Sequence, residues 1–169
     1  MYFKATMDKL AKVITVGCLL LFFGVGYLNL AFLSTNRTTT GNTIIRLLGL
    51  VIVLGIPITC YLIAPIGYYL GNGALTIRRR VRSFSIPLSD ITDVHLLSPD
   101  ETMIRTFGVG GLYGYFGQHH SLRWGRLYLY TTQRRNRILI ETLDGTKLVI
   151  SPDDVQLFAA LHKAITSRR

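Results

Sequence analysis

At 169 residues the chain is long enough for one ordinary soluble domain, but 49% of its residues are hydrophobic and its mean hydropathy is +0.36. Both values are higher than a soluble surface usually tolerates, which argues against a wholly soluble protein. The apolar excess lies near the N-terminus, where 13–32 and 47–77 contain no charged side chain. The formal net charge is +10, and fourteen Lys and Arg but only eight Asp and Glu lie after residue 70.

The two uncharged runs predict two transmembrane helices, at about 13–33 and about 43–69. A helix rises about 1.5 Å per residue, so about twenty apolar residues cross the roughly 30 Å hydrocarbon core of a bilayer. A cleaved secretory signal is the alternative for the first run, because Lys4, Lys9 and Lys12 precede it. That run is longer than a usual signal core, and no small-residue cleavage site follows it. Buried helices of a soluble bundle are disfavoured because the first run has almost no polar face.

Proline and tyrosine residues shape the prediction for the second run. Pro57 and Pro65 each remove a backbone donor, so we expect a bent helix from about Asn42 to about Ile63 or Tyr69, whose freed carbonyls are satisfied by neighbouring groups. Aromatic rings favour the headgroup level of a bilayer, and three tyrosines lie near the end of this run: Tyr61, Tyr68 and Tyr69.

The distribution of Lys and Arg predicts the orientation. Basic residues precede the first run and directly follow the second, whereas the link at 34–43 holds only Arg37, with Arg46 close by. By the positive-inside rule both termini face the cytoplasm, and we expect a multi-pass protein of a bacterial inner (plasma) membrane. Asn36-Arg37-Thr38 matches the N-glycosylation pattern, which has no expected role in a bacterium. Cys18 and Cys60 lie in the apolar runs and are expected to be small buried side chains, not a disulfide.

From Gly71 onward, short alternating segments separated by turn residues predict a mainly β domain over 72–169. The expected strands lie at 74–79, 82–86, 91–97, 127–132, 137–142 and 146–150, with weaker ones at 103–107 and 112–116. Leu143-Asp144-Gly145 between two alternating strands is a strong hairpin signal. We expect this hairpin to set Ile138 and Ile140 against Leu148 and Ile150.

The last predicted element is a helix at about 152–166. Ser151 can cap it, Pro152 suits its first position, and Asp153 and Asp154 suit the positive end of the helix dipole. Apolar residues then recur at steps of three and four, so one face should pack on the sheet. We expect a partly open antiparallel barrel of about seven strands closed by this helix, because that architecture protects strand edges and buries the apolar stripe.

Several short motifs in this region occur in an order that suggests a family. They are Leu75-Thr76-Ile77, 84–91 (FSIPLSDI), Arg105-Thr106-Phe107-Gly108, 110–117 (GGLYGYFG) and 149–153 (VISPD). Over roughly 72–166 the chain resembles the bacterial pleckstrin-homology-like (PH-like) domains found beside membrane helices. The resemblance implies a seven-stranded barrel with a C-terminal helix and a binding or scaffolding role. It implies no catalytic residue, and the lipid-binding loop of eukaryotic relatives has no counterpart in this sequence.

A run of arginines is the first candidate site. Arg78, Arg79, Arg80 and Arg82 directly follow the second apolar run. Next to a bilayer, each basic residue can gain on the order of 1 kcal/mol from anionic lipid headgroups. The run is therefore either a lipid and membrane-surface site or a topology signal alone.

The segment from Gly108 to Trp124 is the predicted contact surface for a partner protein. The residues chosen for that surface are Tyr113, Tyr115, Phe116, Arg123 and Trp124. Trp124 suits either a protein-contact hot spot or a membrane-interface anchor. Arginines with aromatics also suit single-stranded nucleic acid, but a membrane tether argues against it, so no nucleic-acid partner is expected.

Other chemistry is weakly supported. Gly108 to Gly114 superficially resembles a nucleotide-binding loop, but it has no βαβ context and fits a tight, aromatic-packed loop or bulged strand better. His119 and His120 are adjacent and would point to opposite faces of a strand, which disfavours a shared metal. No nucleophile elbow or triad spacing is visible. We therefore expect no cofactor, no metal and no enzymatic activity.

The functional hypothesis is a membrane-anchored PH-like module. It would bind a partner protein or anionic lipid headgroups at the cytoplasmic face. The alternatives are an accessory subunit of a larger membrane complex that does not bind lipid, and an enzyme that acts on a membrane-embedded substrate.

Overall fold

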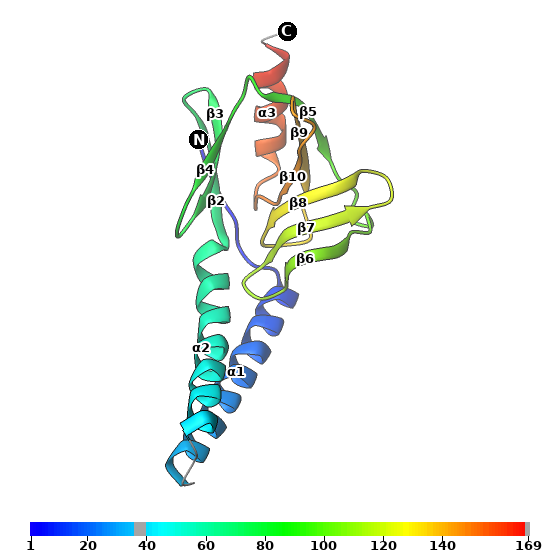
Figure 1. Ribbon diagram of the computed structural model, residues 1–169. Coiled ribbons are helices and arrows are strands. Elements are labelled where there is room, and N and C mark those ends of the chain that lie inside the picture. Colours follow the sequence, from blue (N-terminus) through cyan, green and yellow to red (C-terminus); the bar gives the residue numbers. More distant parts are fainter. Residues whose placement is uncertain (36–39, 168–169) are drawn as a thin grey trace.

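The computed structural model of the protein describes residues 1–35 and 40–167, and in Figure 1 two long helices extend from one end of a mainly β domain. In chain order the elements are β1 (Tyr2–Lys4), α1 (Lys9–Thr35), α2 (Thr40–Ile63), β2 (Pro65–Gly71), β3 (Ala74–Arg79), β4 (Phe84–Pro87), β5 (Ile91–Leu96), β6 (Ile104–Gly110), β7 (Tyr115–Ser121), β8 (Gly125–Thr131), β9 (Ile138–Thr142), β10 (Lys147–Ile150) and α3 (Gln156–Thr166). The predicted order of elements is confirmed: two apolar helices, then a mainly β region, then a C-terminal helix. The glycosylation pattern at 36–38 lies outside the described residues.

Both N-terminal helices are long and apolar enough to cross a membrane. The candidate spans are Lys9–Phe32 and Thr43–Ile63, and only 11% of each apolar window is buried inside the protein. The 21 residues of the second span rise about 32 Å, close to the thickness of a hydrocarbon core. Asp8 starts α1 as its N-cap, because its Oδ1 accepts a hydrogen bond from the Ala11 amide at 2.7 Å.

The second helix ends at the earlier of the two positions that the sequence analysis considered. α2 continues through Pro57 and stops at Ile63, so the alternative of a helix as far as residue 69 is wrong. Pro65 disfavours helical geometry at Ala64, and from Pro65 the chain forms β2. Tyr68 and Tyr69 therefore lie in a strand, where Tyr68 is fully buried.

The strands form two sheets among the described residues. The first has the order β1-β2-β3-β4 and the second β5-β9-β10-β8-β7-β6. β1, which the sequence analysis did not predict, pairs with β2 and so brings the N-terminus into the β domain. Pairing is antiparallel except between β8 and β10, which run parallel. The eight predicted segments each overlap one of the strands β3 to β10, and the unpredicted β1 and β2 bring the number of described strands to ten.

The main core lies where the two sheets and α3 meet. It is built from apolar side chains of both sheets together with Leu157 and Leu161 of α3. The β9–β10 hairpin has the predicted register, with Ile140 opposite Leu148 and Ile138 opposite Ile150. A second cluster on the other face of the larger sheet contains Leu127, Leu129 and Val149.

The last helix begins later than predicted. α3 starts at Gln156, with Val155 at its N-cap position and no side-chain cap. Ser151 is therefore not the cap: its hydroxyl accepts hydrogen bonds from the amides of Thr132 and Gln133 instead. Asp153 accepts hydrogen bonds from the amide and hydroxyl of Thr6, both at 2.9 Å. These bonds tie the segment between β1 and α1 to the segment between β10 and α3.

Candidate functional site

The junction between the helices and the β domain is the first part of the site. The turn that joins β6 to β7 reaches the N-terminal part of α1, where the Thr15 hydroxyl donates to the Gly111 carbonyl at 3.1 Å. The same hydroxyl accepts a hydrogen bond from the Tyr113 amide at 2.9 Å. Gly111 has a φ of +120°, and a Cβ there would lie 2.7 Å from the Ile14 side chain. The glycine-rich segment is thus a strand-turn-strand hairpin that fits closely against a helix.

The opposite side of this turn contacts α2. The Tyr113 ring meets the Tyr61 ring edge to face, with centroids 5.3 Å apart. The Arg80 guanidinium lies 3.8 Å from the centroid of Tyr61 and donates to the Tyr61 carbonyl at 3.1 Å. Burial raises the pKa of Tyr113. An aromatic pair with a stacked arginine therefore connects the β6–β7 turn, α2 and the β3–β4 turn.

Two of the predicted partner-surface residues face the chain's own helices. Phe116 is 4% exposed and belongs to a small apolar cluster with Cys60, Ala64 and Leu112, against which Tyr113 also packs. Cys18 and Cys60 both adjoin this cluster as free thiols. The β6–β7 turn is therefore part of the interface between the helices and the domain.

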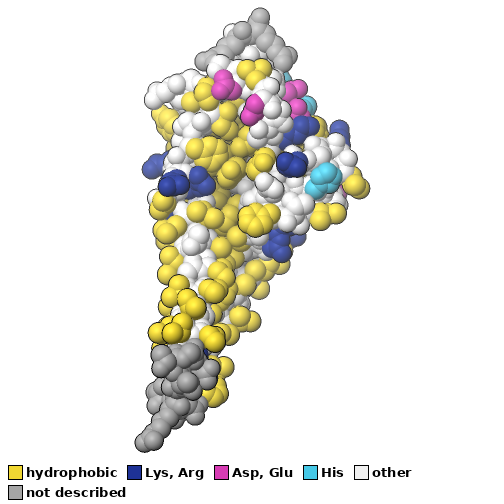
Figure 2. Space-filling view, viewed as in Figure 1, with side chains coloured by type: hydrophobic (Ala, Val, Ile, Leu, Met, Phe, Trp, Pro, Cys, Tyr) yellow, Lys and Arg dark blue, Asp and Glu magenta, His cyan; other side chains and the backbone are white. Residues whose placement is uncertain are grey.

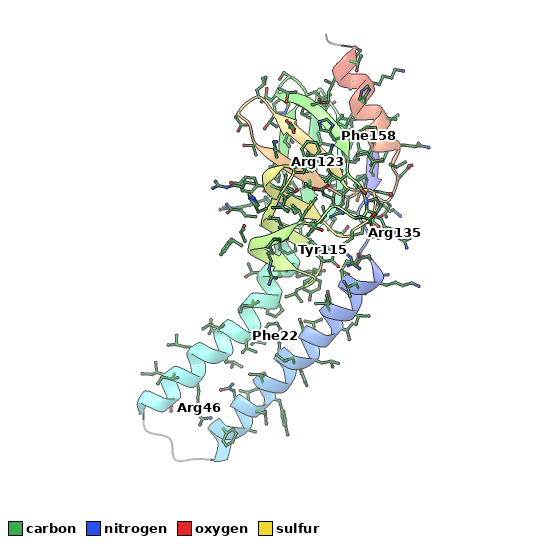
Figure 3. The ribbon with its side chains drawn as sticks, turned by 90° about the vertical axis from the view of Figure 1, so that its right-hand side faces the viewer. Phe22, Arg46, Tyr115, Arg123, Arg135 and Phe158 are labelled. Atoms are coloured by element: carbon green, nitrogen blue, oxygen red, sulfur yellow. The ribbon has the colours of Figure 1, made fainter. Side chains whose placement is uncertain are left out.

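Tyr115 lies on the other face of the same hairpin, near the start of α1. Its hydroxyl donates to Asp8 Oδ1 at 3.4 Å, and burial raises its pKa, with the Asp8 charge adding to the effect. Asp8 also accepts a hydrogen bond from the Arg134 amide and lies 3.5 Å from the Arg134 Nε. In Figure 3, Tyr115 lies near the helix–domain junction, whereas Arg46 lies at the far end of α2.

Arg78, Arg79, Arg80 and Arg82 form what we call the basic edge, at the domain end of α2. The amide of Val81 donates to the carbonyl of Leu62 at 3.2 Å, which fixes the β3–β4 turn against the last turn of α2. Arg82 adopts a φ of +56°, a bend that lets its carbonyl accept a hydrogen bond from Arg79 Nε at 3.0 Å. The four arginines are therefore held together at one level along the helix axis.

The members of the basic edge differ in what they contact. Arg79 is partly covered and lies over the rings of Phe84 and Tyr130, at 5.1 and 5.8 Å. Arg78, Arg80 and Arg82 are exposed. Within residues 1–35 and 40–167, the ion pairs join His95 to Asp93, Arg134 to Asp8 and Lys147 to Glu141, and none involves the basic edge. Its positive charge is thus uncompensated in this part of the chain.

Figure 2 shows the same distribution on one face of the molecule. The helices are covered by apolar side chains, and Lys and Arg side chains gather where the helices meet the β domain. The acidic side chains visible on this face lie farther from the helices. This arrangement places cations next to the apolar region that a bilayer would cover.

Arg123 and Trp124 lie apart from the basic edge, at the turn between β7 and β8. The Trp124 ring lies 5.0 Å from the His95 ring, 5.0 Å from the Arg123 guanidinium and 5.5 Å from Lys147 Nζ. His95, Arg123 and Trp124, with Phe158 and His162 of α3, line a hollow of about 450 Å³ that we call the Trp124 pocket. The structure thus separates the predicted partner surface into the helix-facing turn and this pocket.

Arg137 is a buried arginine that the sequence analysis did not identify. Its side chain is 8% exposed, and its Nη2 donates to the carbonyls of Ser98, Pro99 and Glu101. Arg137 thus holds the 98–101 loop over the sheet. Arg137 also lines a small polar pocket of about 290 Å³. His119 on β7 is 5% exposed and lines the same pocket, and its burial lowers its pKa. Among the described residues, no three His, Cys, Asp or Glu side chains gather as a metal site would require.

Comparison with known proteins gives one match. The family model described as bacterial PH domain matches residues 66–165, which is more than half of the chain and runs from β2 into α3. No curated protein and no solved structure matches the chain. The two sheets and C-terminal helix agree with a PH-like fold, and the resemblance found in the sequence is confirmed. The chain therefore belongs to the bacterial PH domain family.

Proposed function

We propose that this protein is a membrane-anchored PH domain that binds anionic lipid headgroups at the cytoplasmic face of a bacterial inner membrane. The observation that carries the proposal is the basic edge. Its exposed members Arg78, Arg80 and Arg82 lie beside the last turn of a candidate membrane span and have no acidic partner among the described residues. We further propose that the protein has no enzymatic activity of its own.

The energetics of surface electrostatics support this binding mode. Each basic residue near an anionic leaflet gains on the order of 1 kcal/mol, and the effect falls off within a Debye length of roughly 8 Å at physiological ionic strength. The contact of Arg80 with Tyr61 keeps the edge at the end of the span, well inside that range if α2 crosses the bilayer. Three exposed arginines would then favour an anionic leaflet over a neutral one by more than tenfold.

The proposed orientation rests on where the two ends of the chain lie. β1 pairs with β2, so the N-terminal strand and the β domain are on the same side of the two helices. Lys4, Lys9 and Lys12 join the basic edge on that side. By the positive-inside rule, that side is the cytoplasm.

The test uses the full chain, since β1 makes the N-terminus part of the β domain. The protein would be reconstituted in nanodiscs that contain phosphatidylglycerol and phosphatidylcholine, and the lipids that remain bound after release would be identified by native mass spectrometry. The double variant Arg78→Gln with Arg82→Gln should lose most of the preference for phosphatidylglycerol. These two side chains are exposed, and neutralisation leaves Arg79 and Arg80 in their structural contacts.

The matched control removes the same charge elsewhere. Arg123→Gln with Arg126→Gln changes two exposed arginines at and beside the β7–β8 turn and should leave the lipid preference unchanged. An equal preference for phosphatidylglycerol in the wild type and in the Arg78 and Arg82 double variant would contradict the proposal that the basic edge binds anionic headgroups.

A partner protein is the second candidate ligand, and the Trp124 pocket favours it. Trp124 combines a large, partly buried ring with two nearby cations, a composition typical of protein-contact hot spots. Photocrosslinking from position 122, where Leu122 is 95% exposed beside this pocket, would capture such a partner in cells. A specific crosslinked band that disappears in Trp124→Ala would support it.

A further inference from the structure

An apolar groove runs between α2 and the β6–β7 hairpin. It has a volume of about 800 Å³. From α2 its lining includes Ile52, Gly55 and Ile56, and from the hairpin it includes Phe107 and Val109. This size is in the range of small-molecule sites, which are also mostly apolar. The groove therefore has the size and lining of a binding site for a hydrophobic ligand.

The position of the groove indicates what fills it. The lining residues on α2 extend from Ile52 to Ile63, all within the candidate span Thr43–Ile63. That stretch rises about 16 Å, close to the depth of one leaflet, which is about half of a 30 Å hydrocarbon core. Ile52 and Ile56 are 59% and 44% exposed, so the floor of the groove is continuous with the lipid-facing surface of α2.

The rim and the inner end of the groove fit the two parts of a phospholipid. Phe107 on the edge strand β6 is 76% exposed, which leaves a large ring available to cover an acyl chain. At the domain end, Cys60 and Ile63 line the groove, at the end of α2 that the basic edge adjoins. Cations at this level of the helix are suited to a lipid phosphate.

We propose that this groove holds one phospholipid of the inner leaflet, with an acyl chain between α2 and the β6–β7 hairpin and its phosphate at the level of the basic edge. The inference rests on the proposed function in that α2 must cross the membrane. It adds a specific site, occupied by one lipid per chain, to the general attraction of the basic edge for anionic headgroups. The lipid would complete the contact between a helix and a hairpin that protein atoms alone leave open.

Gly55 allows the groove to be filled without disturbing its walls. A Cβ built at Gly55 meets nothing within 4 Å, so a leucine side chain there would extend into the groove. Leucine also has a higher helix propensity than glycine. Gly49 is the matched control, because a Cβ there also meets nothing within 4 Å and Gly49 does not line the groove.

The experiment counts lipids bound to the full chain. Wild type and the variants would be extracted in mild detergent from nanodiscs of phosphatidylglycerol and phosphatidylcholine, and the masses of the intact complexes measured. We expect the wild type and Gly49→Leu to retain one lipid per chain and Gly55→Leu to lose it at least tenfold. Thr59→Leu, a second substitution in the lining, should act like Gly55→Leu, and circular dichroism would verify that each variant is folded.

The outcomes separate the groove from the basic edge. Gly55→Leu should reduce occupancy by both lipids, whereas Arg78→Gln with Arg82→Gln should change only which lipid is bound. Retention of one lipid by both folded groove variants, or no retained lipid in the wild type, would overturn the groove proposal and leave the basic edge standing. Loss of lipid in Gly55→Leu, together with no headgroup preference in the wild type, would support the groove proposal and overturn the basic edge as a lipid site. A dimer that Gly55→Leu dissociates would show that a second chain fills the groove, and would also overturn the proposal.

Discussion

Thr15 in α1 and Gly111 in the β6–β7 turn are joined by a 3.1 Å hydrogen bond across 96 residues of sequence. The Thr15 hydroxyl also lies 2.6 Å from the Ala11 carbonyl, so it shares its proton between the helix and the turn. Its oxygen accepts the Tyr113 amide. One side chain of a candidate membrane helix thus satisfies a donor and an acceptor of the PH domain, which makes the helix and the domain one folding unit.

The first prediction concerns this link. Thr15→Val keeps the shape of the side chain but leaves the Tyr113 amide and the Gly111 carbonyl without their partner. An unsatisfied buried group costs about 1–3 kcal/mol, so we expect a loss of that size in the free energy of unfolding. Hydrogen exchange at the Tyr113 amide should accelerate. Thr15→Ser retains the hydroxyl and should remain close to the wild type, and equal protection of Tyr113 in Thr15→Val would refute the link.

The elements that the sequence predicted well are those specified by local patterns. The uncharged runs gave α1 and most of α2, and the Asp144-Gly145 turn gave the β9–β10 hairpin with its register. The sequence did not decide between Ile63 and Tyr69 as the end of α2, because Tyr68 and Tyr69 continue the apolar run although they belong to a strand. Hydrophobicity does not distinguish a lipid-facing residue from one in a buried strand, and here only Pro65 marked the boundary.

The features that the sequence did not predict depend on long-range pairing. β1 is three residues long and exists because Tyr2 and Phe3 pair with Tyr69 and Tyr68. Asp8 is the only acidic residue before Asp90, and its role as cap of α1 and partner of Arg134 appears only in the fold. Arg137 is buried because three carbonyls of one loop surround its guanidinium. The nearby Arg134 and Arg135 are exposed, so no local pattern distinguished it.

The basic edge was predicted as a cluster, but its structure was not. Four arginines in five residues indicated a membrane-facing site. The sequence did not show that Arg79 is held by Phe84 and Tyr130, or that Arg80 stacks on Tyr61. These contacts join residues of different strands and helices. They show that Arg79 and Arg80 make contacts within the fold, and hence why Arg78 and Arg82 are the pair chosen for mutation.

A second prediction concerns Tyr68, whose hydroxyl is buried between the two sheets. It donates to the Tyr130 carbonyl at 2.6 Å and accepts the Ser151 amide at 3.1 Å. Tyr68→Phe should lower the free energy of unfolding at neutral pH by about 1–3 kcal/mol, because both partners lose their hydrogen bond. Denaturant titration would measure the loss. Tyr69→Phe, at the neighbouring and partly exposed position, should have a much smaller effect.

Tyr68→Phe should also change how the free energy of unfolding depends on pH in the alkaline range. Burial raises the pKa of Tyr68 above its ordinary value of 10.0, so the folded protein keeps this phenol neutral while the unfolded chain ionises. The contribution of Tyr68 is therefore fully present below pH 10 and is lost as pH rises above it. In Tyr68→Phe this part of the alkaline loss should disappear. If the free energy of unfolding fell equally steeply between pH 9.5 and 11 in the wild type and in Tyr68→Phe, the alkaline loss would not come from Tyr68.

A third prediction concerns His119 at acidic pH. Burial, with a further effect of the Arg105 charge, lowers its pKa from the ordinary 6.5. The unfolded chain then binds a proton that the folded protein does not, so stability is fully present above pH 6.5 and decreases as pH falls below it. His119→Gln should flatten the decrease in melting temperature between pH 7.5 and 5.5. The charged side chains of Glu101, Arg134 and Arg137 line the same pocket as His119.

The neighbouring histidine provides the control for that experiment. His120 is exposed on the opposite face of β7. His120→Gln should therefore show the same decrease in melting temperature at acidic pH as the wild type. If both substitutions flatten the melting profile equally, the acid sensitivity does not come from burial of His119.

A fourth prediction tests the depth of β6 in the membrane. The chain contains one tryptophan, Trp124, which lies away from the helix–domain junction. In a Trp124→Phe background, Phe107→Trp would put the single indole at the rim of the apolar groove. In liposomes its emission should be blue-shifted and quenched by brominated acyl chains, since interfacial aromatic residues contact the hydrocarbon boundary. The emission of Trp124 in the wild type should be insensitive to the same lipids. A red-shifted, unquenched indole at position 107 would mean that β6 faces water and that the domain is held away from the bilayer.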